Sequence, residues 1–169
     1  MRLQKLSRKF GKKTRFQKKV FFLVPEPKSL ANATLEELKA CKLGYRAKYV
    51  LDASRAIASG KIDFEELKKV SYHECKELLL KLPGIGDKVA DCVMLFSLEK
   101  LNAFPLDTWM LKILQKYYSD NFDINKKTIS KKRYEDIHQN VLEHFGKYAG
   151  YSQQFLYKME RDLNEKKWL

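Results

Sequence analysis

Cysteine and long apolar runs are scarce in this 169-residue sequence, and each absence excludes a class of protein. Its three cysteines, Cys41, Cys75 and Cys92, are odd in number and far apart, which argues against a disulfide framework, a zinc site or an iron–sulfur cluster. No run approaches the ~20 apolar residues that a membrane span needs. The basic start, MRLQKLSRKFGKK, lacks the apolar stretch of a secretory signal, so we expect an intracellular protein.

Positively charged residues are in clear excess in this sequence. The 34 lysines and arginines exceed the 21 aspartates and glutamates, which gives a net charge of +13. Such an excess is typical of proteins with a polyanionic partner, most often a nucleic acid, although it can also be a solubilising surface. Hydrophobic residues make up 44% and aromatic residues 12%, which indicates a folded domain with a core.

Helical periodicity dominates from about residue 34 onward, and short signals mark where helices begin. T-L-E-E at 34–37 and S-Y-H-E at 71–74 are capping boxes, and the second predicts a helix that runs to Leu80. Asp87 and Asp107 stand where N-caps of the following helices would stand. The other expected helices cover 44–58, 88–98, 108–118, 130–145 and 149–164.

The overall pattern predicts an all-α protein with no substantial β-sheet. VFFLV at 20–24 is a possible extended piece. We expect residues 1–30 to be the remnant of a preceding helix and loop, followed by a helical domain over 31–165.

The stretch LPGIGDK at 82–88 predicts a short turn between two helices, a helix–hairpin–helix over about 71–98. Glycine permits positive φ and a close backbone approach. The free N–H groups and the dipole at the start of the second helix suit a phosphate. Gly84, Ile85 and Gly86 are therefore candidate DNA contacts that position a backbone without reading bases, although a plain helix connection would also explain the turn.

Lys88 lies in the first turn of that second helix, where the positive end of the dipole disfavours a cation. This field makes a neutral amine more available, and a neutral amine is a nucleophile that can form a Schiff base with a sugar carbon. The simpler interpretation is a surface lysine. Asp107, 19 residues later, is expected to be held ionised by backbone N–H groups, and it could serve the same site or act only as a cap.

Three stretches resemble one family. LPGIGDKVADCVMLFSLEKLNAFPLDTW at 82–109 resembles the helix–hairpin–helix and Gly/Pro…Asp signature of base-excision DNA glycosylases. LGYRAKYV at 43–50 and FGKYAGYSQQFLY at 145–157 are similar to 8-oxoguanine DNA glycosylases of the bacterial type. The resemblance covers about residues 30–158 and implies a helix–hairpin–helix glycosylase fold, with the bacterial cytoplasm as the compartment.

The resemblance also implies roles for individual residues. Lys88 matches the lysine that attacks C1′ of the damaged nucleoside, expels the base, forms a Schiff base and leads to β-elimination. Asp107 matches the aspartate whose carboxylate stabilises positive charge on the sugar. Tyr45 and Arg46 match residues near the gap left by the flipped nucleotide and near its orphaned partner base.

Three more residues match the pocket for the flipped base. An enzyme that acts on a base must rotate it out of the duplex. Cys92 and Tyr157 match the residues that sandwich that base, although many relatives carry phenylalanine at the second position, and Gln153 matches the glutamine that reads its Watson–Crick edge. Without the resemblance, Cys92 and Tyr157 would be read as core residues and Gln153 as a surface residue. Cys92 follows Lys88 by four residues, so the two share a helix face.

The sequence departs from the family pattern in two places. Trp109 stands where animal relatives carry histidine, as D-T-W does in the bacterial branch. Family members normally carry a β-domain and further helices before the segment that begins here, so the resemblance implies an N-terminally truncated form, either a fragment or a minimal enzyme.

Three functions remain open from the sequence. The first is a bifunctional glycosylase and apurinic/apyrimidinic lyase that acts on double-stranded DNA with oxidised guanine or an abasic site, as a monomer. The second is an inactive or lyase-only DNA-binding fragment, and the third is a basic RNA-associated helical protein. No redox or organic cofactor and no metal site is expected, and the resemblance implies at most a monovalent or alkaline-earth cation under the hairpin carbonyls.

Overall fold

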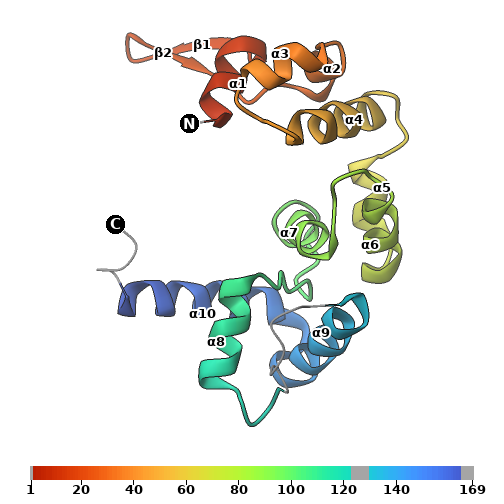
Figure 1. Ribbon diagram of the computed structural model, residues 1–169, viewed down its shortest axis with the longest axis vertical. Helices are drawn as coiled ribbons and strands as arrows, with labels where there is room; N and C mark the ends of the chain where they lie inside the picture. The colour runs from red at the N-terminus through yellow and green to blue at the C-terminus, as the bar shows by residue number, and fades with distance from the viewer. Residues whose placement is uncertain (1, 123–129, 165–169) are drawn as a thin grey trace. The chain divides into compact units, whose positions relative to one another are not determined.

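The computed structural model describes residues 2–122 and 130–164 (Figure 1). The chain divides into two compact units. The first unit comprises Met1–Phe64 with Lys81–Gly84, and the second comprises Glu65–Leu80 with Ile85–Leu169. The all-α prediction is confirmed, because helices dominate and the described residues hold a single two-stranded sheet.

The first unit packs four helices and a β-hairpin around a small core. Leu6, Leu30, Leu38, Ala47 and Leu51 are buried together in that core. The capping box predicted at Thr34 is present, since its hydroxyl accepts from the Glu37 N–H while the Glu37 carboxylate accepts from the Thr34 N–H. The elements are α1 Arg2–Phe10, β1 Lys13–Phe16, β2 Lys19–Phe22, α2 Pro27–Ala31, α3 Leu35–Ala40 and α4 Arg46–Ala58.

The β-hairpin gives the expected extended piece a defined structure. Strands β1 and β2 are antiparallel, with Phe16 opposite Lys19, so that Gln17 and Lys18 alone form the turn. Both turn residues have positive φ, 46° and 63°, as a two-residue type I′ connection requires. Whether residues 1–30 are the remnant of a larger preceding part stays a prediction.

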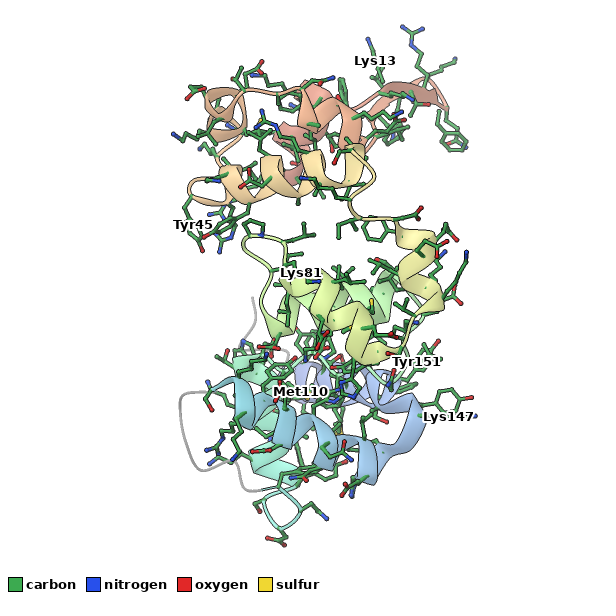
Figure 2. The ribbon with its side chains drawn as sticks, turned by 90° about the vertical axis from the view of Figure 1, so that its right-hand side faces the viewer. Lys13, Tyr45, Lys81, Met110, Lys147 and Tyr151 are labelled. Carbon is green, nitrogen blue, oxygen red and sulfur yellow. The ribbon has the colours of Figure 1, made fainter. Side chains whose placement is uncertain are left out.

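The second unit has a larger helical core in which Phe104, Met110, Leu114 and Val141 are fully buried. Met110 is labelled in Figure 2. The second predicted capping box is confirmed, because Ser71 and Glu74 exchange side-chain and backbone hydrogen bonds before α6. The elements are α5 Phe64–Lys69, which begins on the last residue of the first unit, α6 Tyr72–Leu80, α7 Asp87–Ser97, α8 Thr108–Tyr117, α9 Lys131–Phe145, the 3₁₀ helix η1 Gly146–Tyr148 and α10 Ala149–Leu163.

Candidate active site

Helices α6 and α7 and their connection form the helical hairpin that the sequence predicts. Gly84 has φ of +84°, and a Cβ at this position would lie 2.3 Å from Cγ of Tyr49, so both backbone conformation and space require glycine. Gly86 has an extended conformation and open space around its Cα. Gly86 thus presents a backbone without a side chain just before α7.

The predicted cap of α7 was wrong. Gly86, not Asp87, is the N-cap, and it supplies no side-chain hydrogen bond, while Asp87 is the first helical residue. The reason is that the Asp87 carboxylate is turned to Lys76, with 3.5 Å between Oδ1 and Nζ. The first N–H groups of α7 are therefore not capped by a side chain, which leaves them able to donate to an anion.

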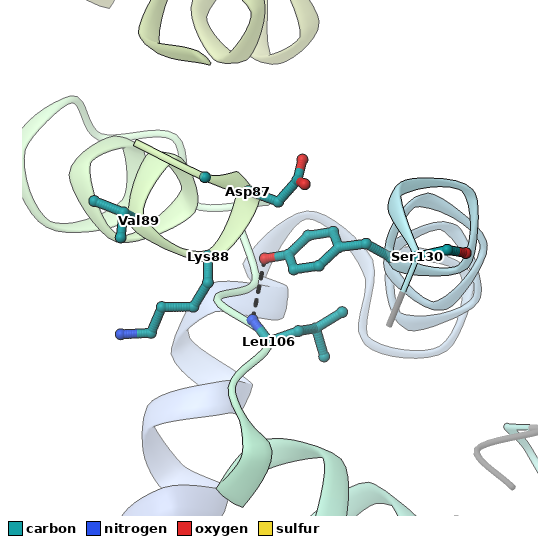
Figure 3. A pocket seen from close by; sticks show the side chains of 7 residues that line it. Asp87, Lys88, Val89, Leu106 and Ser130 are labelled. Atoms are coloured by element: carbon teal, nitrogen blue, oxygen red, sulfur yellow. Dashed lines mark hydrogen bonds between the residues drawn. The ribbon is translucent and has the colours of Figure 1, made fainter. Parts of the chain in front are cut away.

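Lys88 is the second residue of α7, and its side chain is exposed. Within the described residues its ammonium group has no ion pair or hydrogen bond. Figure 3 shows its side chain extending away from that of Asp87. Lys88 lines a hollow of about 240 Å³ with Val89, Leu106 and Tyr134.

Asp107 is the N-cap of α8, as predicted. Its carboxylate accepts hydrogen bonds from the N–H groups of Trp109 at 3.0 Å and Met110 at 2.8 Å. These bonds fix its orientation. Its neighbour Leu106 lines the same hollow as Lys88, so the loop that carries Asp107 and the start of α7 border one pocket.

A buried polar cluster lies behind this pocket. Asp91 is fully buried and accepts from the hydroxyls of Tyr72 at 2.8 Å and Tyr134 at 2.5 Å. Lys76, also buried, lies 3.6 Å from Asp91 and donates to the Tyr72 hydroxyl at 3.1 Å. Burial raises the pKa of Asp91, while the Lys76 charge and the two hydroxyls oppose that shift. Burial, followed by the Asp91 charge, raises the pKa of both tyrosines.

Tyr134 connects the cluster to the Asp107 loop. Its hydroxyl oxygen accepts from the Leu106 N–H at 3.1 Å, which is the dashed line in Figure 3. The proton of the same hydroxyl goes to Asp91. Asp91 lies three residues after Lys88 on α7, so two hydrogen bonds join the helix of Lys88 to the residue before Asp107. This bridge was not predicted from the sequence. Its only signal was a carboxylate inside the apolar face of α7, between Ala90 and Met94.

His138 completes the cluster on the α9 side. Its ring stacks on Tyr72 with centroids 4.7 Å apart, and its Nε2 lies 3.1 Å from the Asn102 carbonyl. Burial, reinforced by the nearby Lys76 charge, lowers the pKa of His138 to about 4. The histidine is therefore neutral near pH 7.

The residues predicted to form a base pocket lie elsewhere in the second unit. Cys92 is half-buried on α7 one turn after Lys88. Gln153 on α10 is buried, and its amide donates to the Pro105 carbonyl at 3.5 Å. Tyr157 packs against the core of α8 and α9. In the part of the chain that the structure describes, none of the three lines the Lys88 pocket, although Gln153 contacts the loop that leads to Asp107.

Tyr45 and Arg46 lie in the first unit, at the start of α4. Tyr45 is 69% exposed, and the Arg46 guanidinium lies 4.5 Å from its ring centroid. Tyr45 also makes an edge contact with Tyr49 at 6.1 Å. These residues form an exposed aromatic and cationic group at the surface of that unit.

Over residues 2–122 and 130–164, no three His, Cys, Asp or Glu side chains lie close enough together to hold a metal ion. No helix within the same ranges has the length and apolar character to cross a membrane.

Comparison with known proteins identifies the family. Residues 3–139 match the HhH-GPD superfamily of base excision DNA repair proteins. The chain is 32% identical over 131 residues to a probable N-glycosylase/DNA lyase of Methanothermobacter thermautotrophicus, which is 66% of this chain and 42% of that protein. It is 31% identical over 144 residues to N-glycosylase/DNA lyase OGG1 of Arabidopsis thaliana, which is 83% of this chain and 39% of the relative.

A solved structure with a similar fold is also a glycosylase/lyase. The Clostridium acetobutylicum 8-oxoguanine glycosylase/lyase, in complex with double-stranded DNA containing cytosine opposite 8-oxoguanine, is similar with a TM-score of 0.83 and 34% identity over 96% of this chain and 53% of that chain. The chain spans less than half the length of the two curated relatives. Since the family match covers most of the sequence and the fold agrees, this chain belongs to the HhH-GPD superfamily of base excision DNA repair proteins.

Proposed function

We propose that this protein is a bifunctional DNA glycosylase and apurinic/apyrimidinic lyase that removes 8-oxoguanine from double-stranded DNA. The observation that carries the proposal is Lys88, an exposed amine without an ion pair in the described residues, at the start of α7 and beside the Asp107 loop. The relatives named as 8-oxoguanine glycosylase/lyase and N-glycosylase/DNA lyase support the reaction class. We also propose that it works inside the cell, as a monomer.

The helical hairpin would hold the DNA backbone. The uncapped N–H groups after Gly86 point out of α7, and the open space at Gly86 lets a phosphate come close. Gly84 keeps the turn in a conformation that other residues adopt only with strain. These contacts position the duplex without reading its sequence.

Lys88 would be the nucleophile. Its neutral amine attacks C1′ of the damaged nucleoside, the C1′–N9 bond breaks, and its electron pair leaves with the base, which takes up a proton. Loss of the amine proton and opening of the sugar ring give a Schiff base between Nζ and C1′. Removal of a proton from C2′ then expels the 3′ phosphate oxygen, which cleaves the strand on the 3′ side.

Asp107 would act through its fixed negative charge. The sugar gains positive charge as the base departs, and a carboxylate held by two backbone N–H groups stabilises that charge without having to reorient. The Asp91–Tyr134–Leu106 bridge would keep the Asp107 loop in place relative to α7. In this role Asp91 and Tyr134 are positioning residues.

The remaining predicted residues would handle the flipped base and the gap it leaves. Cys92 and Tyr157 would contact the two faces of the base, and the Gln153 amide, which offers both donor and acceptor, would read its edge. Tyr45 and Arg46 would contact the DNA where the base has left. Their exposure and close pairing support a role at a DNA surface.

Borohydride trapping tests the proposal directly, because reduction converts the Schiff base into a stable covalent adduct. The substrates are labelled duplexes that carry 8-oxoguanine or an abasic site. We expect adducts on both, lost in Lys88→Gln and retained in Lys132→Gln, which removes an exposed lysine on α9. Failure of Lys88→Gln to abolish the adduct would exclude Lys88 as the nucleophile.

A second candidate is a DNA-binding protein with lyase activity alone or with none. The observation that favours it is that Cys92, Gln153 and Tyr157 do not line the Lys88 pocket within the described residues. An adduct with the abasic duplex only would show a lyase without base excision. DNA binding with no adduct on either substrate would show a binding module.

A further inference from the structure

The net positive charge of the chain is concentrated far from Lys88 in the sequence. Residues 1–28 contain ten lysines and arginines and a single carboxylate, Glu26, which gives +9 of the total +13. The remaining 141 residues are nearly balanced, with 24 basic and 20 acidic side chains. Such a local excess of positive charge indicates a second anion-binding surface, formed by residues outside the helical hairpin.

Most of these cations lack a carboxylate partner. Lys12 pairs with Glu26, and Lys9 lies 3.3 Å from Glu37. The β-hairpin itself carries four exposed cations that form no ion pair with any described residue: Lys13, Arg15, Lys18 and Lys19. Helix α1 adds three more exposed cations of the same kind, Arg2, Lys5 and Arg8.

The β-hairpin that carries these cations also carries exposed aromatic rings. Phe16 is 66% exposed, Phe21 46% and Phe22 39%. In Figure 2 the side chains of the hairpin that carries Lys13 project outward from the ribbon. Exposed phenylalanines cost free energy in water unless something covers them.

The strand register shows that both hairpin faces mix charge with aromatic surface. Side chains directly opposite each other in an antiparallel pair lie on the same face. One face therefore holds Lys13 opposite Phe22 and Arg15 opposite Val20, and the other holds Phe16 opposite Lys19 and Phe21 opposite Thr14. Neither face is a purely apolar docking surface.

This mixture decides between kinds of partner. A protein partner that covered the phenylalanines would also bury the neighbouring lysine and arginine side chains, which have no carboxylate partners in this chain. Burying these charges costs free energy unless the partner protein supplies the carboxylates. A polynucleotide supplies a phosphate for each cation and a base for each ring. In a duplex the bases are stacked inside, so exposed rings can stack only on an unpaired strand.

We propose that the β-hairpin, together with α1, is a binding surface for single-stranded DNA. The cations contact backbone phosphates, and Phe16 and Phe21, on one face, stack on unpaired bases. DNA is the nucleic acid proposed because the chain belongs to a family of DNA repair proteins. This surface shares no residue with the Lys88 site and is testable whether or not Lys88 is catalytic.

The test is binding of the whole protein to a dye-labelled oligothymidine, followed by fluorescence anisotropy at several salt concentrations. We expect Phe16→Ala/Phe21→Ala to weaken binding by at least about fivefold, as the loss of base stacking predicts. The matched control, Phe96→Ala/Phe155→Ala, removes two phenylalanines that are 61% and 74% exposed in the second unit and should bind as the wild type does.

The charge contribution has its own matched pair. Lys18→Gln/Lys19→Gln should lower the slope of log affinity against log salt by about 1.4, since each phosphate contact on a single strand contributes about 0.7. Lys61→Gln/Lys132→Gln removes two exposed lysines elsewhere and should leave the slope unchanged. Circular dichroism should show all four variants folded.

Four results would overturn the proposal. The phenylalanine variant could bind oligothymidine normally, or the hairpin variants could affect a duplex of equal length as strongly as the single strand. Oligouridine could compete better than oligothymidine, which would indicate RNA. Light scattering could show a dimer that Phe16→Ala/Phe21→Ala dissociates, which would make the hairpin an interface between two copies of the chain.

Discussion

The helical hairpin of α6 and α7 and the β-hairpin of β1 and β2 both reverse the chain through a short turn with positive φ, but they hold charged side chains in opposite environments. In the helical hairpin, Lys76 and Asp91 are buried and lie 3.6 Å apart. In the β-hairpin, Lys13 and Arg15 are exposed and have no ion pair among the described residues.

The difference indicates what each set of charges does. A buried charge must be paired and hydrogen-bonded within the protein, so the cluster around Asp91 uses its charges to fix the positions of helices. Exposed cations without partners contribute little to folding and remain available to an external anion. Removal of a buried charge near Asp91 should therefore lower stability, whereas removal of an exposed charge of the β-hairpin should weaken binding.

The largest effect is expected at Asp91. Asp91→Ala removes the carboxylate that accepts from the hydroxyls of Tyr72 and Tyr134, and among the described residues it leaves the buried Lys76 with Asp87 as its one carboxylate partner, so we expect a loss of about 3–5 kcal/mol in the free energy of unfolding. Urea denaturation followed by circular dichroism measures it.

The matched control is Asp136→Ala, on the exposed face of α9, where a change within about 0.5 kcal/mol is expected. Equal effects at the two positions would show that Asp91 is not held by the cluster. A large loss at Asp136 alone would reverse the assignment of buried and exposed charge.

A pH dependence should follow from His138. Its pKa is lowered to about 4, mainly by burial, whereas an unfolded histidine has a pKa near 6.5. Between these values the unfolded chain binds more protons, so stability should be complete above pH 6.5 and fall as the pH is lowered to 4, by up to about 3 kcal/mol. Urea midpoints measured from pH 7.5 to 4.5 give the slope.

The raised pKa of Asp91 works in the opposite direction, because it makes stability fall as pH rises above the unfolded value of 3.8. The histidine contribution is therefore taken as the difference between wild type and His138→Gln, which should have a flatter profile. His144→Gln, which removes an exposed histidine of α9 that does not contribute to the His138 shift, should keep the wild-type slope. An unchanged slope in His138→Gln would contradict the prediction.

Short-range signals in the sequence predicted much of the fold. The capping boxes at Thr34 and Ser71 and the N-cap at Asp107 depend on residues two or three positions apart, and all three are present. The hairpin turn with Gly84 was also predicted. Such features need no knowledge of distant parts of the chain.

Long-range contacts account for what the sequence did not predict. Asp91 and Tyr134 are 43 residues apart and meet only because α7 and α9 pack in the same unit. Asp87 is not the cap because Gly86 takes that position and the Asp87 carboxylate lies 3.5 Å from the ammonium group of Lys76, eleven residues earlier. The roles assigned to Lys88 and Gln153 stay predictions, because they depend on a bound substrate.

A smaller effect should separate the two glycines of the helical hairpin. Gly84→Ala places a side chain in a left-handed conformation and 2.3 Å from the Tyr49 ring, so we expect a loss of about 1–3 kcal/mol in unfolding free energy. Gly86→Ala meets no atom within 4 Å and has negative φ, so stability should change by less than about 0.5 kcal/mol.

The same pair also tests the phosphate site. If the backbone at Gly86 contacts a DNA phosphate closely, Gly86→Ala should weaken binding to an abasic duplex, although the variant should be as stable as the wild type. Thermal unfolding and duplex binding on the same samples give both quantities. Normal binding by Gly86→Ala would argue against a close backbone approach at this turn.

The smallest effect is expected at the tip of the β-hairpin, where stability and binding should change in opposite directions. Lys18 has φ of 63°, a conformation that glycine adopts without strain, so Lys18→Gly should raise the unfolding free energy by less than about 1 kcal/mol, or roughly 2–4 °C at most in Tm. Removal of its charge should also lower the salt slope for single-stranded DNA by about 0.7.

Lys18→Gln separates the two contributions, because it removes the charge and keeps a side chain at the strained position. It should show the same lower salt slope as Lys18→Gly without any gain in Tm. A gain in stability together with unchanged DNA binding would mean that Lys18 serves only the turn. In that case the exposed charge of Lys18 would bind no partner, whereas the buried charges around Asp91 bind one another.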